Sequence, residues 1–286
     1  MARLAEIERP SETERGGVTI VRPDAGLLID LGELLEYREL LYFFVWRDIK
    51  VMYKQTLMGA AWAIIQPLFT MLLFTVIFGR VAKVPTDDLP LPIFFYIGLM
   101  LWMYFGNALA RSTNSLVQHQ NLITKVYFPR LLLPISAVIS GWLDLAIAAV
   151  VLVGMMAYYQ VEITLAILTL PLFFLLTVLT AVAAGIWLSA LNAVYRDVRY
   201  AMPFLIQLWM FASPIAYSSA LVPERYRTIY ALNPMAGAVE GFRWSITGQG
   251  SSPGALTWVS LAAVLVMLIS GIVFFHRLES HLVDVI

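Results

Sequence analysis

The side chains that could carry out chemistry are few and widely separated in this chain of 286 residues. Asp87 and Asp88 form the one adjacent pair of acids, in a short loop punctuated by prolines. A catalytic dyad or a metal site at this pair would need further ligands nearby, and the neighbouring sequence offers none. Asp87 and Asp88 are therefore expected to belong to a solvated loop.

Asp144 is the only acid that the sequence places deep inside a long apolar stretch. Ionisable groups at such depth are costly in a membrane and are often functional. A proton relay would need more members, and the other polar residues expected at this depth are mostly Ser, Thr and Asn. A hydrogen bond between helices, or a site beside a water-filled vestibule, is therefore favoured for Asp144.

His119 has no second His close to it, and the chain contains no cysteine. Metal sites of the zinc type are built from several such ligands, so His119 is expected to be an exposed polar residue. The lack of cysteine also excludes disulfides and thiol chemistry, without indicating a compartment.

The elements that must position these residues are six long apolar stretches with almost no ionisable side chain inside them. About 20 helical residues cross a hydrocarbon core of ~30 Å, and a helix satisfies its own backbone polar groups there. The chain is 60% hydrophobic and 13% charged, which is unusual for a soluble domain. The predicted spans are residues 57–79, 93–110, 131–157, 164–191, 201–222 and 255–275.

The distribution of Lys and Arg predicts the orientation of these spans. Eight precede the first span, three lie between spans two and three, two between four and five, and one follows the last. These fourteen lie on one side of the membrane, against five on the other. Because basic residues prefer the cytoplasmic side, both termini are expected to be cytoplasmic. Residues 1–30 are polar, contain no apolar signal-peptide core, and are expected to form a solvated tail.

Two polar segments on the predicted cytoplasmic side could dock a partner. Residues 31–56 are expected to form an amphipathic helix in the membrane interface, which is either a membrane anchor or also a docking surface. Residues 115–128 are expected to form a short helix between spans two and three, which could transmit a movement of the partner to these spans. The residues expected to face a partner are Arg47, Lys50, Lys54, Gln118, Asn121, Lys125 and Arg130.

Residues 223–254 are too long for a hairpin and too apolar for an ordinary loop. Two re-entrant half-helices fit this composition, because irregular backbone at membrane depth must be buried in protein or line a water-filled cavity. Polar members of this region are Tyr226, Tyr230, Glu240 and Arg243. The last two are three residues apart on one helix face and could form a pair. Residues 276–286 are expected to be a short cytosolic tail.

Three motifs resemble the permease subunits of ABC-2 type transporters, most closely those that export polysaccharides. They are NLITKVYFPRLLLP at 121–134, LNAVYRDVRYAMPFLIQLWMFASPIAY at 191–217 and ALNPMAGAVEGFRWSITG at 231–248. The resemblance implies an all-α integral membrane protein with an N-terminal interfacial helix, six transmembrane helices, a coupling helix, and two re-entrant half-helices before the last span.

The resemblance also implies partners and cargo. The chain would be a homodimer in the bacterial cytoplasmic (inner) membrane, bound to two copies of a separate ATPase that holds ATP and Mg. It would carry no cofactor, catalytic residue or metal of its own and bind no nucleic acid. The cargo would be a lipid-linked glycan such as O antigen, capsule or teichoic acid.

A glycan presents apolar CH faces as well as hydroxyl groups, so aromatic rings in a channel would give it low-specificity contacts. By resemblance, this channel lies between two permeases and is lined by spans one, two and five. The aromatic residues expected to contribute are Phe69, Phe74, Phe78, Trp102, Tyr104, Phe105, Trp209 and Phe211.

Three other functions compete with this one. An ABC-2 exporter of a drug or small lipid would share the architecture and stays the main alternative. A secondary transporter or channel would predict coupling carboxylates or inverted repeats, and the sequence shows one buried acid and no convincing repeat. A membrane-embedded glycan enzyme would need several acids or a metal site at the membrane face.

Overall fold

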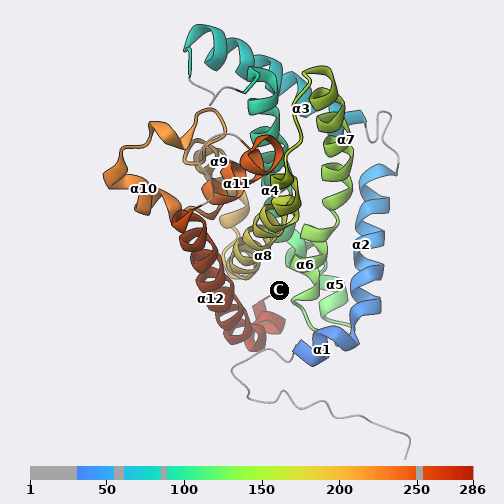
Figure 1. The fold of residues 1–286 in the computed structure, drawn as a ribbon. Coiled ribbons are helices and arrows are strands. Elements are labelled where there is room, and N and C mark those ends of the chain that lie inside the picture. Colours follow the sequence, from blue (N-terminus) through green and yellow to red (C-terminus); the bar gives the residue numbers. More distant parts are fainter. Residues whose placement is uncertain (1–30, 55–60, 85–88, 249–253, 286) are drawn as a thin grey trace, which may run out of the picture.

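The structure is a computed structural model that describes residues 31–54, 61–84, 89–248 and 254–285 (Figure 1). Within these ranges every regular element is a helix, as predicted. The predicted tail at 1–30, Asp87 and Asp88 lie outside the described residues. By length and composition, five described helices could cross a membrane, namely Ala61–Val81, Leu91–Gln118, Leu132–Tyr158, Leu165–Val194 and Thr257–Leu278.

The central element is α4 (Leu91–Gln118), which corresponds to the second predicted span and extends eight residues past it. Pro90 and Pro92 fix the entry of the chain, and a proline in the first helical turn costs no hydrogen bond. Residues 93–102 are all buried, because other helices surround them on every side. The Tyr96 hydroxyl donates to the Ala148 carbonyl at 3.0 Å, which ties α4 to the third span.

The first and third spans flank α4 and neither is a single regular helix. The first consists of α3 (Ala61–Phe74), with Pro67 inside it, followed by the π-helical segment η1 (Thr75–Val81). The third consists of α6 (Leu132–Ile139) and α7 (Trp142–Tyr158), separated at Ser140 and Gly141. These breaks do not shorten the apolar length that could cross a membrane, because each candidate span includes both of its parts.

The fourth and last spans pack against each other on the other side of α4. The fourth begins with a short 3-10 segment, η2 (Leu165–Thr169), and continues as α8 (Leu170–Val194). The last is α12 (Ala255–Val285), so residues 276–285 continue the helix and do not form a separate tail. The Trp187 ring of α8 stacks on the Phe274 ring of α12, with 4.4 Å between centroids.

The predicted fifth span at 201–222 is not one continuous helix. Its helical part, α9 (Val198–Phe211), has 14 residues. At 1.5 Å per residue α9 extends about 21 Å, which is less than the ~30 Å hydrocarbon core. The chain then passes through turns and η3 (Ser219–Leu221) into two further helices. These are α10 (Glu224–Ala231) and α11 (Pro234–Thr247). Two re-entrant half-helices were predicted in this region, and their re-entrant course stays a prediction.

The N-terminal helices and the 115–128 segment lie near one end of the bundle, together with the C-terminal end of α12 (Figure 1). α1 (Leu31–Glu36) leads into α2 (Arg38–Tyr53), which packs along α6. The predicted helix at 115–128 is not continuous. α4 runs to Gln118, His119 interrupts it, and the four-residue α5 (Gln120–Ile123) follows.

Gly241 provides a test of the packing of α11. A Cβ at Gly241 would overlap the Phe173 ring of α8, whereas a Cβ at Gly154 would have no atom within 4 Å. Gly241→Ala should therefore destabilise the protein by about 1–3 kcal/mol through overpacking. Thermal unfolding of the detergent-solubilised protein measures this effect, with Gly154→Ala as the matched control. Equal unfolding temperatures for the two variants would contradict the close packing of α11 on α8.

Candidate functional site

The break after α9 is held by the side chain of Arg243 from α11, which is only 6% exposed. Its guanidinium donates to the Pro214 carbonyl at 2.6 Å, the Ile215 carbonyl at 3.0 Å and the Phe94 carbonyl at 3.3 Å. It also lies over the Phe94 ring, 3.6 Å from the centroid. Arg243 thus satisfies two carbonyls of the irregular segment that follows α9 and also bonds a carbonyl of α4, which a planar group with five N–H donors can do.

Asn233, directly before α11, forms hydrogen bonds with other polar groups at the same break. Its side-chain amide donates to the Ala212 carbonyl at 2.9 Å and to the Ser213 hydroxyl at 3.0 Å. Its side-chain oxygen accepts from the Trp209 indole at 2.9 Å and from the Met235 amide at 3.1 Å, so it also caps α11. The sequence motif at 231–248 contains Asn233, but its role at the break was not predicted.

The other predicted residues of this region have contacts of their own. Glu240 accepts a hydrogen bond from the Ser219 amide at 3.0 Å. The Tyr230 hydroxyl donates to the Tyr217 hydroxyl at 3.2 Å, and Tyr226 is exposed with Arg225 over its ring. The pairing of Glu240 with Arg243 stays a prediction, while both side chains have backbone partners from the segment that follows α9.

At the opposite end of the bundle, Arg47 of α2 contacts His119 at the end of α4. Arg47 Nη2 lies 2.7 Å from His119 Nε2, and His119 Nδ1 lies 2.8 Å from the Ser115 carbonyl. Because a guanidinium only donates and a carbonyl only accepts, Nε2 accepts and Nδ1–H donates. His119 is half-buried, so the prediction of an exposed side chain was wrong. Its neutral imidazole joins two elements.

The remaining docking candidates lie near this contact, and most are exposed. Lys50 is exposed and lies over the Trp46 ring, with 4.1 Å between its Nζ and the centroid. Arg130 is half-buried, and the other exposed candidates are Lys54, Gln118, Asn121 and Lys125. The three basic residues of α2 do not share one free face, because Arg47 turns toward Asp48 at 2.8 Å and His119. Their contact with a partner stays a prediction.

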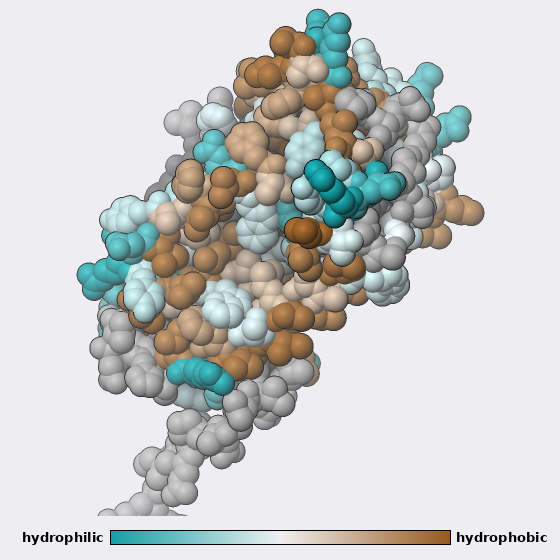
Figure 2. All heavy atoms as spheres, turned by 90° about the vertical axis from the view of Figure 1, so that its left-hand side faces the viewer, coloured by the Kyte–Doolittle hydropathy of each residue, from teal (hydrophilic) through white to brown (hydrophobic). Residues whose placement is uncertain are grey.

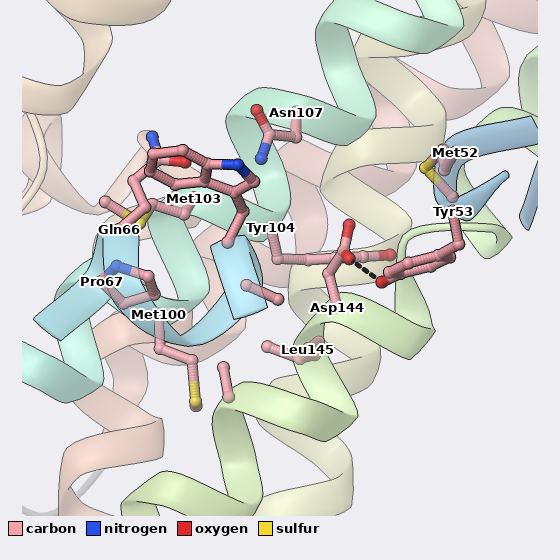
Figure 3. A pocket seen from close by; sticks show the side chains of 13 residues that line it. Met52, Tyr53, Gln66, Pro67, Met100, Met103, Tyr104, Asn107, Asp144 and Leu145 are labelled. Carbon is pink, nitrogen blue, oxygen red and sulfur yellow. Dashed lines mark hydrogen bonds between the residues drawn. The ribbon is translucent and has the colours of Figure 1, made fainter. Parts of the chain in front are cut away.

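Asp144 joins three helices and lines a cavity (Figure 3). Tyr53, the last residue of α2, donates its hydroxyl hydrogen to Asp144 Oδ1. Arg111 of α4 lies 3.6 Å from Asp144 Oδ2. Burial, and then this hydrogen bond, raises the pKa of Tyr53 above its ordinary value, so the hydroxyl stays protonated and donates. The predicted hydrogen bond between helices at Asp144 is thus confirmed.

The aromatic residues predicted to line a path divide into buried and exposed groups. Trp102, Tyr104 and Phe105 of α4 are at most 5% exposed, so they pack inside this chain. Trp209 is partly buried against Phe105 and bonded to Asn233, and Phe74 and Phe78 pack on Phe95. Only Phe69 and Phe211 present their rings outward, at 65% and 54% exposure.

A family model described as ABC-2 type transporter matches residues 39–247. This match covers well over half of the chain and includes most of α2, the break after α9 and α11. The chain therefore belongs to the ABC-2 type transporter family, which confirms the resemblance drawn from its three motifs.

Curated relatives match over most of their own length. The O-antigen export system permease protein RfbA of Myxococcus xanthus is 30% identical over 241 residues, which cover 83% of this chain and 91% of the relative. A Klebsiella pneumoniae protein of the same name is 24% identical over 87% of this chain and 95% of the relative. The polysialic acid transport protein KpsM of Escherichia coli is 25% identical over 82% of this chain and 92% of the relative.

Arg243→Met should strongly destabilise the protein, because it keeps the length of the side chain and removes every donor. Each buried carbonyl left without a partner costs about 1–3 kcal/mol. Arg227→Met is the matched control, since the Arg227 side chain is 42% exposed and its nearest acid is the exposed Glu224 at 3.8 Å. Thermal unfolding in detergent should show a large loss for Arg243→Met only. A similar stability for the two variants would contradict the assigned role of Arg243.

Proposed function

We propose that this chain is the membrane-spanning permease subunit of an ATP-driven exporter that moves a lipid-linked polysaccharide across the bacterial cytoplasmic membrane. The observation that carries the proposal is the match along 91–95% of relatives named for O-antigen export. Similarity that extends over nearly the whole relative includes the elements that would form a path, whereas a short shared motif would not.

The working unit we propose is a dimer of this chain with two copies of a separate ATPase. The exposed apolar surfaces support a partner within the membrane. α3 exposes Trp62, Phe69, Leu72 and Leu73, and α9 exposes Phe204, Leu208 and Phe211. Both helices pack against α4, and Figure 2 shows apolar side chains over much of the left-hand face of Figure 1, interrupted by hydrophilic patches.

We further propose that the path lies between two copies and is bordered by α3 and α9. Phe69 and Phe211 are the predicted aromatic residues that could meet a passing glycan directly. Trp102, Tyr104 and Phe105 would support the wall from behind, because they are buried in this chain. The polar end formed by α2, α5 and the end of α4 would receive the ATPase.

The composition of the purified complex tests this proposal. The tagged chain should be extracted from its native membrane in mild detergent and weighed intact by native mass spectrometry. Two copies of this chain with two copies of an ATPase are expected, and retained glycolipid would identify the cargo. A lone chain, or an oligomer of this chain alone, would contradict the proposal if a known ABC complex survives the same conditions.

The Arg47–His119 contact should transmit ATPase motion to the spans. Removing either partner, in Arg47→Ala or His119→Ala, should lower the export per ATP hydrolysed about five- to tenfold, as expected for losing a coupling of about 1 kcal/mol or more. Both rates can be measured in proteoliposomes that contain the complex.

The double variant separates coupling from simple loss of structure. If the two residues act as a unit, the double variant should be no worse than either single one. Glu39→Gln, at the exposed beginning of α2, is the control and should keep the ratio of export to hydrolysis. Additive losses in the double variant would show that Arg47 and His119 act independently.

A further inference from the structure

A cavity of about 240 Å³ lies between the C-terminal end of α2 and the helices α3, α4 and α7 (Figure 3). Each of these helices contributes at least one polar side chain to the lining, and these are Tyr53, Gln66, Tyr104, Asn107 and Asp144. Gln66, Asn107 and the lining residue Trp62 are exposed, so the cavity is accessible from the surface of the chain.

The charge at this cavity is balanced within the chain. Among the residues that the structure describes, Asp144 is the only charged one that lines the cavity, and Arg111 lies 3.6 Å from Asp144 Oδ2. A cationic ligand would compete with Arg111, and an anionic ligand would be repelled by Asp144 at close range. The electrostatics therefore favour a ligand without net charge.

The lining also separates polar from apolar groups. Two amide side chains and a carboxylate with unused lone pairs offer donors and acceptors suited to hydroxyl groups. The Trp62 ring and the side chains of Met100, Met103 and Leu145 offer flat or adaptable apolar contact. A ligand that fits both halves must carry hydroxyl groups at its edge and apolar CH groups on its faces.

We propose that this cavity is a binding subsite for one uncharged sugar unit of the exported glycan. The proposal rests on the proposed function and assigns new residues to it, namely Trp62, Gln66, Asn107 and Asp144. Amide and carboxylate groups bind the hydroxyl groups of the sugar, while its CH face rests on Trp62. Tyr53 and Arg111 are positioning residues that hold the Asp144 carboxylate in place.

Photo-crosslinking in the native bacterium tests the subsite. p-Benzoylphenylalanine is placed at Gln66 or at Asn107, the cells are irradiated, and the purified protein is analysed by carbohydrate staining and intact mass. A glycan adduct is expected at both positions. The control position is Val150, which is on α7, 72% exposed and not part of the cavity. At least a fivefold excess over this control is the expected result.

Two outcomes overturn the subsite. Equal glycan labelling at Val150 would show unspecific contact, and adducts with the mass of a phospholipid alone would show that the cavity holds an acyl chain.

A second measurement covers the case in which a photoreactive variant does not accumulate. Asn107→Leu keeps the bulk of the side chain but removes its amide, and should raise by at least threefold the amount of host lipid extract needed for half-maximal ATPase stimulation. An unchanged requirement overturns the proposal.

Deletion of the gene for this chain distinguishes a failure of the subsite from a failure of the proposed function on which it rests. If deletion leaves the surface polysaccharide unchanged, the proposed function fails and the subsite fails with it. If deletion abolishes surface polysaccharide but Gln66 and Asn107 give no glycan adduct, the export function stands and only the subsite is overturned.

Discussion

The constraint on which this structure depends is that backbone polar groups in a hydrocarbon environment must find partners inside the protein. Most of the chain meets it with long helices. The segment after α9 does not, because its carbonyls at Ala212, Pro214 and Ile215 are released where the helix stops. Arg243 and Asn233 supply the donors. An irregular connection can therefore lie among the apolar helices without unpaired carbonyls at these positions.

This solution links distant parts of the fold. α11 can bring Arg243 to the break only because it is buried between α4, α8 and α12, and Gly241 allows its close approach to Phe173. Gly98 in α4 makes room for the guanidinium, since a Cβ there would lie 2.8 Å from Arg243 Nη2. The ionic group is thus held by packing as well as by hydrogen bonds, and its CH₂ stem and ring stacking add apolar contact.

The sequence predicts what depends on local composition. Apolar length is a local property, and it identified the five candidate spans, while three sequence motifs identified the family. It failed at 201–222, because the apolar pattern continues past Ala212 while the groups that stabilise the break come from Asn233 and Arg243. The same limit applies to His119 and Asp144. Their partners, Arg47 and Tyr53, lie 72 and 91 residues away in the chain, so no local pattern could reveal them.

The two contacts of α2 connect this helix to two separate parts of the bundle. Near the middle of α2, Arg47 is hydrogen-bonded to His119. At the end of α2, Tyr53 is hydrogen-bonded to Asp144 beside the cavity. The Phe44 ring of α2 also packs edge-on against the Phe128 ring, with 5.6 Å between the centroids. α2 is thus in contact with the rest of the bundle at Phe44, Arg47 and Tyr53. Under the proposed function, a movement of α2 imposed by an ATPase would act on the end of α4 through Arg47 and on the polar network at Asp144 through Tyr53.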